Sequence, residues 1–459
     1  MEIEIIAKEM IKPSSPTPNH LRNYKLCLLD QLIPAAYAPI VLFYPNQDAA
    51  ATHLQVLERI ALLKKSISEV LSRFYPLAGA IKDDVSVDCD DRGACFTTAK
   101  VKHALCEFLE NPDLKAIASF LSCDESYVTN IQASLFECGG IAIGLCISHR
   151  ILDGTALSTF LKAWSDIAAA SSSEERPMKN INIYPDFSAS SLFPSNDSRL
   201  KQASMAMWGC LFKKGQFVTK RFVFDRLAIT ALKEMATGGD GKCAATSVEA
   251  VSGFIWKHAM AASEESRFGT KKPSLLTHVV NLRKRASPNL SENSLGNLIW
   301  MASAKLHSLS DNDDHHRNLG LISCLVDRVR KSISKIDGDY VKKIQGDDGF
   351  ITMHKYLKEI EELGSKDVDY YGFTSWRKLG FYEVDFGWGK PVWVSSIDSS
   401  GYFFMNLVIL MDTRCGSGIE AWMTLDKQEM DALERNKEFR ARCSVNPSPL
   451  SIGKDQHKN

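Results

Sequence analysis

The sequence contains 459 residues, of which 45% are hydrophobic, 24% charged and 9% aromatic. A chain of this length exceeds one compact core, so we expect two large globular domains and no long disordered region. Lys plus Arg and Asp plus Glu number 55 each, so there is no basic excess to neutralise a phosphate backbone, and nucleic acid is not an expected partner.

The cysteines and the apolar segments indicate the cellular compartment. Twelve cysteines are scattered along the chain without a CxxC pair, which predicts reduced thiols rather than a disulfide framework or a zinc site. The stretch MEIEIIAKEM lacks the basic region and long apolar core of a secretory signal, and the longest apolar run, FFMNLVILM, is too short to span a membrane. We therefore expect a cytoplasmic protein with no membrane segment.

In the N-terminal half, strand and helix patterns alternate. A short first strand is followed by a proline-rich segment, IKPSSPTPNH, which predicts an extended lead-in. The elements expected next are a helix at 52–74 opened by a capping box of Thr52 and Gln55, a hairpin at 84–98, a strand at 139–149 and a helix from 153.

In the C-terminal half, the same alternation resumes after a polar stretch without periodicity. We place the domain boundary there, with domains at 1–202 and 217–459 and a crossover loop at 203–216. Because strands and helices alternate in both halves, the predicted fold class is α/β. The expected elements are a strand from 217, a helix at 245–260 with a capping box of Thr246 and Glu249, a strand at 275–285, a helix after 309–318, strands at 405–414 and 418–425, and a helix at 426–443.

The segment CISHRILDG contains the first candidate functional residues. Alternation places His149 at the end of a row of buried aliphatic side chains, and Asp153 falls at the start of the following helix, where a carboxylate meets unpaired N–H groups. The two residues can be a core histidine beside a helix cap, or a general base and its neighbour. They are spaced for metal binding, but no third ligand completes a site and no metal is expected.

Other catalytic motifs are excluded because they have the wrong spacing or are absent. HRILD and VDFGWGK faintly resemble two kinase motifs, but they lie too far apart and no glycine-rich loop precedes them. GGDGK lacks the spacer of a phosphate-binding loop, and no GxSxG elbow of a serine hydrolase is present.

The segment GFYEVDFGWGKPVWV, residues 380–394, is the second unusual stretch. Two glycines flank Trp388 and a proline follows, so the segment needs special backbone geometry and is expected to bury Phe386 and Trp388 as anchors.

Together, SHRILDG and VDFGWGKP resemble the HxxxDG and DFGWG motifs of the plant BAHD acyltransferases, in the same order and at a similar separation. The resemblance extends through YKLCLLDQ, FYPLAG, FECGGIAIG, VVNLRKR, SLGN and SWRKLGFY, and therefore covers nearly the whole chain. The sequence is most similar to the vinorine synthase branch, which acetylates alkaloid and terpenoid hydroxyls.

The resemblance implies two similar-sized α/β domains of the CoA-dependent acyltransferase type with a channel between them, the first completed by residues from about 385 to 407. It implies a monomer without a permanently bound cofactor that uses an acyl-CoA, acetyl-CoA by branch, to acylate a small-molecule alcohol. An imidazole, with an ordinary pKa of about 6.5, can take the hydroxyl proton as the oxygen attacks the thioester, so no acyl-enzyme is required.

The resemblance also implies residue roles. His149 is the catalytic base, and Asp153 points away from the channel and pairs with Arg283. Trp388 and backbone N–H groups are candidate oxyanion donors. The residues expected to shape the site are Asp153, Arg283, Asp385, Gly387, Trp388 and Gly389, and those expected to bind CoA are Thr246, Ser247, Lys257, Ser375 and Trp376.

Two other functions remain open from the sequence. A catalytically inactive relative would bind CoA or a small molecule without turnover. A condensation-type enzyme would form an amide from a carrier-bound donor, and such enzymes usually have a second histidine where this chain has Ser148.

Overall fold

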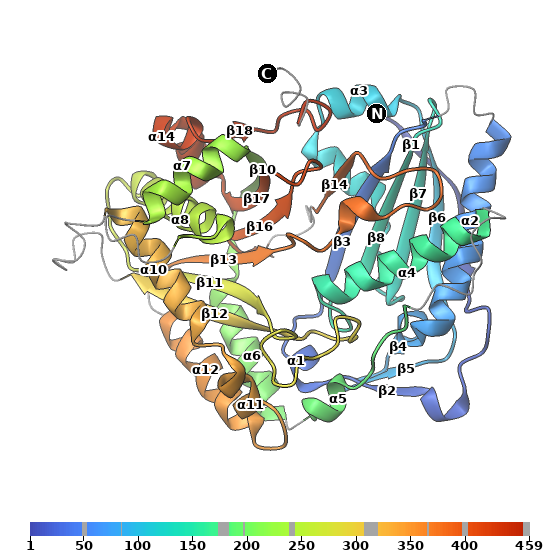
Figure 1. Ribbon diagram of the computed structural model, residues 1–459, viewed down its shortest axis with the longest axis horizontal. Coiled ribbons are helices and arrows are strands. Elements are labelled where there is room, and N and C mark those ends of the chain that lie inside the picture. The colour runs from blue at the N-terminus through green and yellow to red at the C-terminus, as the bar shows by residue number, and fades with distance from the viewer. Residues whose placement is uncertain are drawn as a thin grey trace.

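The computed structural model shows two α/β domains side by side, each built on its own sheet (Figure 1). It describes residues 1–47, 53–83, 85–172, 183–195, 198–237, 244–306, 320–364, 367–396 and 403–452.

The N-terminal domain is built on a six-stranded sheet in the order β1-β6-β7-β8-β3-β14, as far as the described residues go. Within it, β6 and β7 are parallel and the other neighbours are antiparallel. The long helices α2 and α4 lie across one face of this sheet (Figure 1), and their apolar stripes join its core. The strands are β1 (Ile3–Ile11), β3 (Tyr37–Tyr44), β6 (Ala94–Val101), β7 (Thr129–Phe136), β8 (Ile141–Ser148) and β14 (Trp393–Ser395), and the helices are α1 (Leu28–Gln31), α2 (His53–Arg73), α3 (Leu105–Glu110), α4 (Gly154–Ser172) and α5 (Ala189–Leu192).

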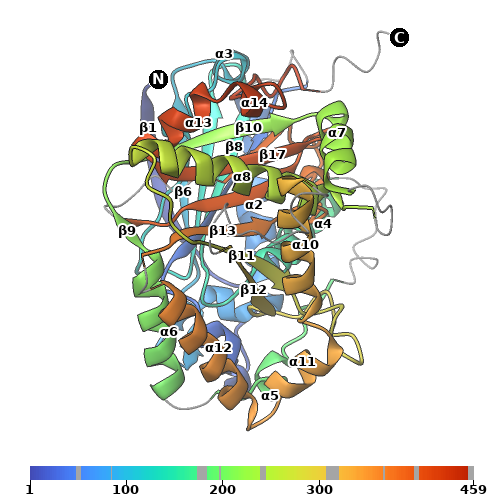
Figure 2. The same ribbon diagram turned by 90° about the vertical axis from the view of Figure 1, so that its left-hand side faces the viewer.

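The C-terminal domain is built on a seven-stranded sheet, again counted over the described residues, in the order β12-β11-β13-β16-β17-β10-β18. Alternate side chains of its strands enter two separate cores: Leu276 packs with α7, α8, α10 and α13, whereas Leu275 packs with α6, α11 and α12. Figure 2 shows α6 and α12 side by side. The strands are β10 (Phe217–Phe224), β11 (Ser274–Asn281), β12 (Ile299–Leu306), β13 (Asp369–Ser375), β16 (Leu407–Asp412), β17 (Ile419–Asp426) and β18 (Ser444–Val445), and the helices are α6 (Ser198–Leu211), α7 (Arg226–Thr237), α8 (Ser247–Ser266), α10 (Leu321–Ser334), α11 (Gly338–Ile344), α12 (Gly349–Gly364), α13 (Lys427–Arg435) and α14 (Lys437–Arg440).

Most predicted elements are present. The helices expected from 52, 153 and 245 are α2, α4 and α8, and the capping box of Thr246 and Glu249 is formed by both of its hydrogen bonds. Thr52 lies outside the described residues. The helix expected at 426–443 is divided into α13 and α14 because Asn436 leaves the helical conformation and caps the second piece.

The predicted hairpin at 84–98 is wrong. Its two strands exist, but β5 (Ser86–Asp88) pairs with β2 (Asn23–Lys25) and β4 (Ala80–Ile81) in a small separate sheet. The second strand, β6, lies between β1 and β7. Local alternation identifies strands, but pairing partners are chosen by burial across the whole domain.

The connection at 203–216 is also not the expected loop, because helix α6 occupies residues 198–211. Its buried side chains, Leu200, Ala203, Met207 and Leu211, recur at helical spacing and pack in the core that contains α12. Because polar residues separate these four positions in the sequence, the narrow apolar stripe does not stand out as a helical pattern.

The segment between β13 and β16 leaves the C-terminal domain and returns. It runs beside α4, where Phe386 packs on Trp164, turns, and comes back as β14 against β3. Strand β14 thus completes the N-terminal sheet, and residues from 407 belong to the C-terminal one.

Candidate active site

His149 follows the last residue of β8, where the buried strand ends. Its backbone N–H donates to the carbonyl of Ala36 at 2.8 Å, and its side chain is partly exposed to solvent. The ring is therefore not enclosed by packed neighbours, as a core histidine would be.

The imidazole is oriented by an amide from the other domain. His149 Nδ1 lies 3.0 Å from Asn297 Oδ1, and Asn297 Nδ2 donates to the carbonyl of His149 at 2.7 Å and to Asp30 Oδ1 at 2.9 Å. Because Nδ2 faces two acceptors, Oδ1 is the atom presented to the ring, and Nδ1 must carry the hydrogen. The lone pair is then on Nε2, as a general base requires.

The sequence patterns did not predict Asn297 or Asp30 as residues of the site. Both lie in segments quoted for the family resemblance, SLGN and YKLCLLDQ, but neither segment has a local pattern that places an amide beside an imidazole.

Asp153 caps helix α4. Its Oδ1 accepts from the N–H of Ala156 at 2.9 Å. The carboxylate also forms a two-pronged ion pair with Arg283, at 2.7 and 3.1 Å, and both side chains are buried. Such a partner offsets the cost of burying the charge.

The loop at 294–297 connects these two contacts. Arg283 Nη2 donates to the carbonyls of Ser294, at 2.9 Å, and Gly296, at 3.3 Å, while Asn297 at the end of the loop holds His149. One loop of the C-terminal domain therefore supports both residues of the HxxxD motif.

The DFGWG segment stabilises its own turn. Asp385 Oδ1 accepts from the N–H groups of Gly387, at 2.8 Å, and Gly389, at 2.9 Å. Both glycines have positive φ, 106° and 110°, a conformation that other residues rarely adopt.

This segment lies at the opposite end of the sheet from His149. Trp388 packs against Tyr44, with ring centroids 6.4 Å apart, whereas Ser148 pairs with Tyr37. Seven residues of β3 separate these points, about 23 Å at strand spacing. Trp388 is thus too remote to donate to an oxyanion at His149, and Asp385 is too remote for direct chemistry.

The residues expected to bind CoA fall in different places. Helix α8 runs against the parallel strands, because Arg267 at its C-terminal end pairs with Asp369, the first residue of β13, at 2.8 Å, so Thr246 and Ser247 at its start lie toward the other ends of the strands. Ten residues further on, about 15 Å along the axis, Lys257 pairs with Glu438 at 2.7 Å. The structure therefore does not bring Lys257 together with Thr246 and Ser247.

Ser375 and Trp376 end β13 next to the HxxxDG loop. A side chain on Gly154 would come within 3.6 Å of the Trp376 indole nitrogen. On its other side, Trp376 borders a cavity between this segment and the β16–β17 turn, lined also by Tyr382, Lys378 and Arg414. This cavity offers an aromatic wall and two cations near the HxxxDG loop, together with the carboxylates of Glu383 and Asp412.

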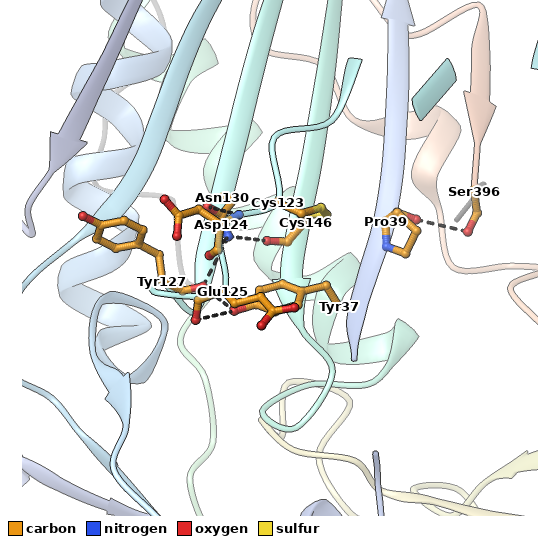
Figure 3. The surroundings of a disulfide bond; sticks show 9 residues. All are labelled: Tyr37, Pro39, Cys123, Asp124, Glu125, Tyr127, Asn130, Cys146 and Ser396. Carbon is orange, nitrogen blue, oxygen red and sulfur yellow. Dashed lines mark hydrogen bonds between the residues drawn. A yellow bond between two sulfur atoms is a disulfide. The ribbon is translucent and has the colours of Figure 1, made fainter. Parts of the chain in front are cut away.

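The prediction of reduced cysteines is wrong for one pair. Cys123 and Cys146 form a disulfide with Cα atoms 5.6 Å apart, and Cys146 lies three residues before His149 (Figure 3). The loop before β7 folds back at Asn130, which is paired with Cys146, and so brings Cys123 over β8. A separation of 23 residues with no local motif gives no sign of this pairing.

Two further features concern metals and membranes. Across the described ranges, no cluster of three or more His, Cys, Asp or Glu side chains is arranged to hold a metal ion. The helices that the structure describes include none with the length and apolarity needed to cross a bilayer.

The fold and this site define a two-domain acyltransferase. A family model described as Transferase family matches residues 1–440, and the chain belongs to this family, that of the BAHD acyltransferases. The predicted family membership and α/β two-domain fold are confirmed.

Known relatives are similar to this chain over nearly their whole length. The chain is 41% identical to limonoid 7-O-acetyltransferase of Citrus sinensis, covering 98% of this chain and 100% of that one. It is 36% identical to stemmadenine O-acetyltransferase of Catharanthus roseus, covering 94% and 96%. The crystal structure of vinorine synthase superposes with a TM-score of 0.77 at 32% identity, covering 96% and 98%.

Proposed function

We propose that this acyltransferase transfers an acetyl group from acetyl-CoA to a hydroxyl of a plant alkaloid or terpenoid, with His149 as general base. The observation that carries the mechanism is the Asn297 contact, which leaves the partly exposed His149 with its lone pair on Nε2. The relatives named for O-acetylation of limonoids and of stemmadenine support the reaction and the acceptor class.

The proposed reaction is a direct transfer. Nε2 takes the proton of the acceptor hydroxyl while its oxygen forms a bond to the thioester carbonyl carbon. The tetrahedral intermediate then loses the CoA thiolate, which receives the proton from the imidazolium. The base is restored, and no acyl-enzyme forms.

We assign the other residues of the site to support and binding. Asp153 and Arg283 hold the loop that carries His149, and the DFGWG turn holds the segment that completes the first sheet. The phosphates of CoA need cations and N–H groups, and the α8 terminus at Thr246 and Ser247 and the cavity beside Trp376 supply both near the strand ends.

The substrates would meet in a channel between the two domains. The reaction does not require a second subunit, and we propose a monomer, which sedimentation of the purified protein would show as a single-chain mass.

The test is a comparison of wild-type protein with His149→Ala. Purified proteins are incubated with acetyl-CoA and a panel of alkaloid, terpenoid and phenolic alcohols, and products are read by mass. We expect the substitution to lower turnover by about 10² to 10⁴ while thermal stability and CoA binding persist.

A matched control is His103→Ala, since His103 is a partly exposed histidine paired with Glu107 away from the site. Its activity should equal that of the wild type. CoA binding without product from any alcohol would indicate an inactive relative, and product only from an amine and a carrier-bound donor would indicate condensation chemistry.

A further inference from the structure

A second carboxylate, Asp30, lies behind the amide that orients His149. We infer that Asp30 is a positioning residue for the base: it fixes the orientation of Asn297 and thereby the tautomer of His149. This inference rests on the proposed role of His149.

The surroundings of Asp30 are built to hold an ionised acceptor. The side chain is fully buried, and its Oδ1 accepts from the backbone N–H of Asn297 at 2.7 Å and from Asn297 Nδ2 at 2.9 Å. Its Oδ2 accepts from the N–H of Cys27 at 2.9 Å. Burial raises the pKa of Asp30, but three N–H donors converge on the carboxylate, and these hydrogen bonds lower the pKa and favour the ionised form.

The neighbouring Gly296 sets the backbone conformation of the loop at this contact. A side chain on Gly296 would lie 3.5 Å from Asp30 Oδ1, and Gly296 has φ of 123°, which favours glycine. Because the loop can approach the carboxylate at this point, the backbone and side chain of Asn297 reach the same oxygen atom.

The positioning argument follows from the donors and acceptors. An ionised carboxylate only accepts, so the atom of Asn297 that faces Asp30 must be the donor Nδ2. The remaining atom, Oδ1, then faces His149 Nδ1 and requires a hydrogen there. The carbonyl of His149 favours the same orientation, so loss of Asp30 should weaken the arrangement without abolishing it.

The chain of contacts crosses the domain boundary twice. Asp30 belongs to α1, whose apolar residues Cys27, Leu28 and Leu29 are buried in the C-terminal core together with Leu298. Asn297 belongs to the C-terminal domain, and His149 returns to the N-terminal one. The tautomer of the base thus depends on the docking of both domains.

The experiment is a double-mutant cycle of Asp30→Asn and Asn297→Ala in the full chain, with kcat and KM measured for acetyl-CoA and alcohol. We expect Asp30→Asn to lower kcat by roughly ten- to a hundredfold, by analogy with the loss seen when a partner that orients a metal-binding histidine is removed. KM for acetyl-CoA should not change. If Asp30 acts through Asn297, the double variant should lose no more kcat than Asn297→Ala alone.

The matched control is Glu429→Gln. Glu429 is also a buried carboxylate with a raised pKa, and it accepts from Ser263 Oγ at 3.0 Å, in the C-terminal core away from the site. The Glu429→Gln variant should be less stable than the wild type but should keep the wild-type kcat. Additive losses in the cycle, or the same kcat in Asp30→Asn as in Glu429→Gln, would overturn the inference.

A second measurement does not need turnover. Diethyl pyrocarbonate acylates the free nitrogen of a neutral imidazole, and site-resolved mass spectrometry compares His149 with His103 in each variant. In Asp30→Asn, we expect diethyl pyrocarbonate to modify His149 more slowly than in the wild type and His103 at an unchanged rate. An unchanged rate at His149 would contradict the inference even if no acceptor alcohol were found, which keeps its failure distinct from that of the proposed function. If Asp30→Asn does not fold, Asp30→Ser serves in both measurements, with the same expected losses.

Discussion

At the scale of single residues, the two ends of the HxxxD motif have separate partners. His149 is oriented by an amide, Asn297, while Asp153 is bound by Arg283 and by the start of α4. The carboxylate four residues after the base therefore does not form a serine-hydrolase type of triad with it. We therefore expect Asp153 to affect activity only through the loop that both residues contact.

Asp153→Asn tests this separation. Removing one charge leaves Arg283 buried without its partner, which typically costs about 3 to 5 kcal/mol. We expect a correspondingly lower free energy of unfolding and a lower yield, with activity falling in proportion to folded protein. Denaturant titration and turnover per folded molecule measure the two effects. Wild-type stability combined with a selective loss of turnover would show that Asp153 takes part in the chemistry.

At the scale of elements, the loop before β7 is attached to the active-site strand. The Cys123–Cys146 disulfide joins it to β8, and the Tyr37 hydroxyl at the start of β3 donates to the carbonyl of Tyr127 at 2.7 Å (Figure 3). Ser148, next to the base, donates from its N–H to the carbonyl of Val128. The end of β8 is therefore held from both sides at the point where His149 begins.

Loss of the disulfide should lower stability more than activity. Closing a loop with a residue separation of 23 corresponds to about 3 kcal/mol in the chain-entropy model. Cys123→Ser, or reduction of the wild type, should lower the free energy of unfolding by about that amount, measured by denaturant titration. The control, Cys106→Ser, changes an exposed free cysteine and should have no effect. Alkylation of Cys123 and Cys146 in the unreduced protein would disprove the bond.

At the scale of the whole molecule, the two domains are joined through an aromatic and charged cluster. Arg221 on β10 is fully buried, with its guanidinium 4.9 Å from the ring of Trp393 on β14 and 3.0 Å from Glu420 on β17. Trp393 also stacks on Trp422 of β17 at 5.8 Å. The strand that completes the N-terminal sheet is thereby fixed to the C-terminal one.

Arg221→Met tests the contribution of this cluster. Burial already raises the pKa of Glu420, and removing the cation leaves the carboxylate uncompensated, at a cost of about 3 to 5 kcal/mol. We expect the two domains to unfold less cooperatively, as seen by tryptophan fluorescence and calorimetry. The double variant Arg221→Met/Glu420→Leu should recover most of the lost stability, because both charges are then absent. Failure of the second change to recover stability would place the cost in the lost cation–π contacts instead.

The sequence by itself was enough to predict most of the local elements, the family and two residues of the candidate site. Helices α2, α4 and α8 and strand β8 follow from periodicity and capping, which act within a few residues, and His149 and Asp153 follow from where a strand ends and a helix begins. Tertiary structure alone decided the partners of β5 and β6, the Cys123–Cys146 bond, the distance of Trp388 from the base, and the Asn297–Asp30 contact. Each of these joins segments far apart in the chain, and such contacts depend on how two cores pack together, for which a single sequence has no local pattern.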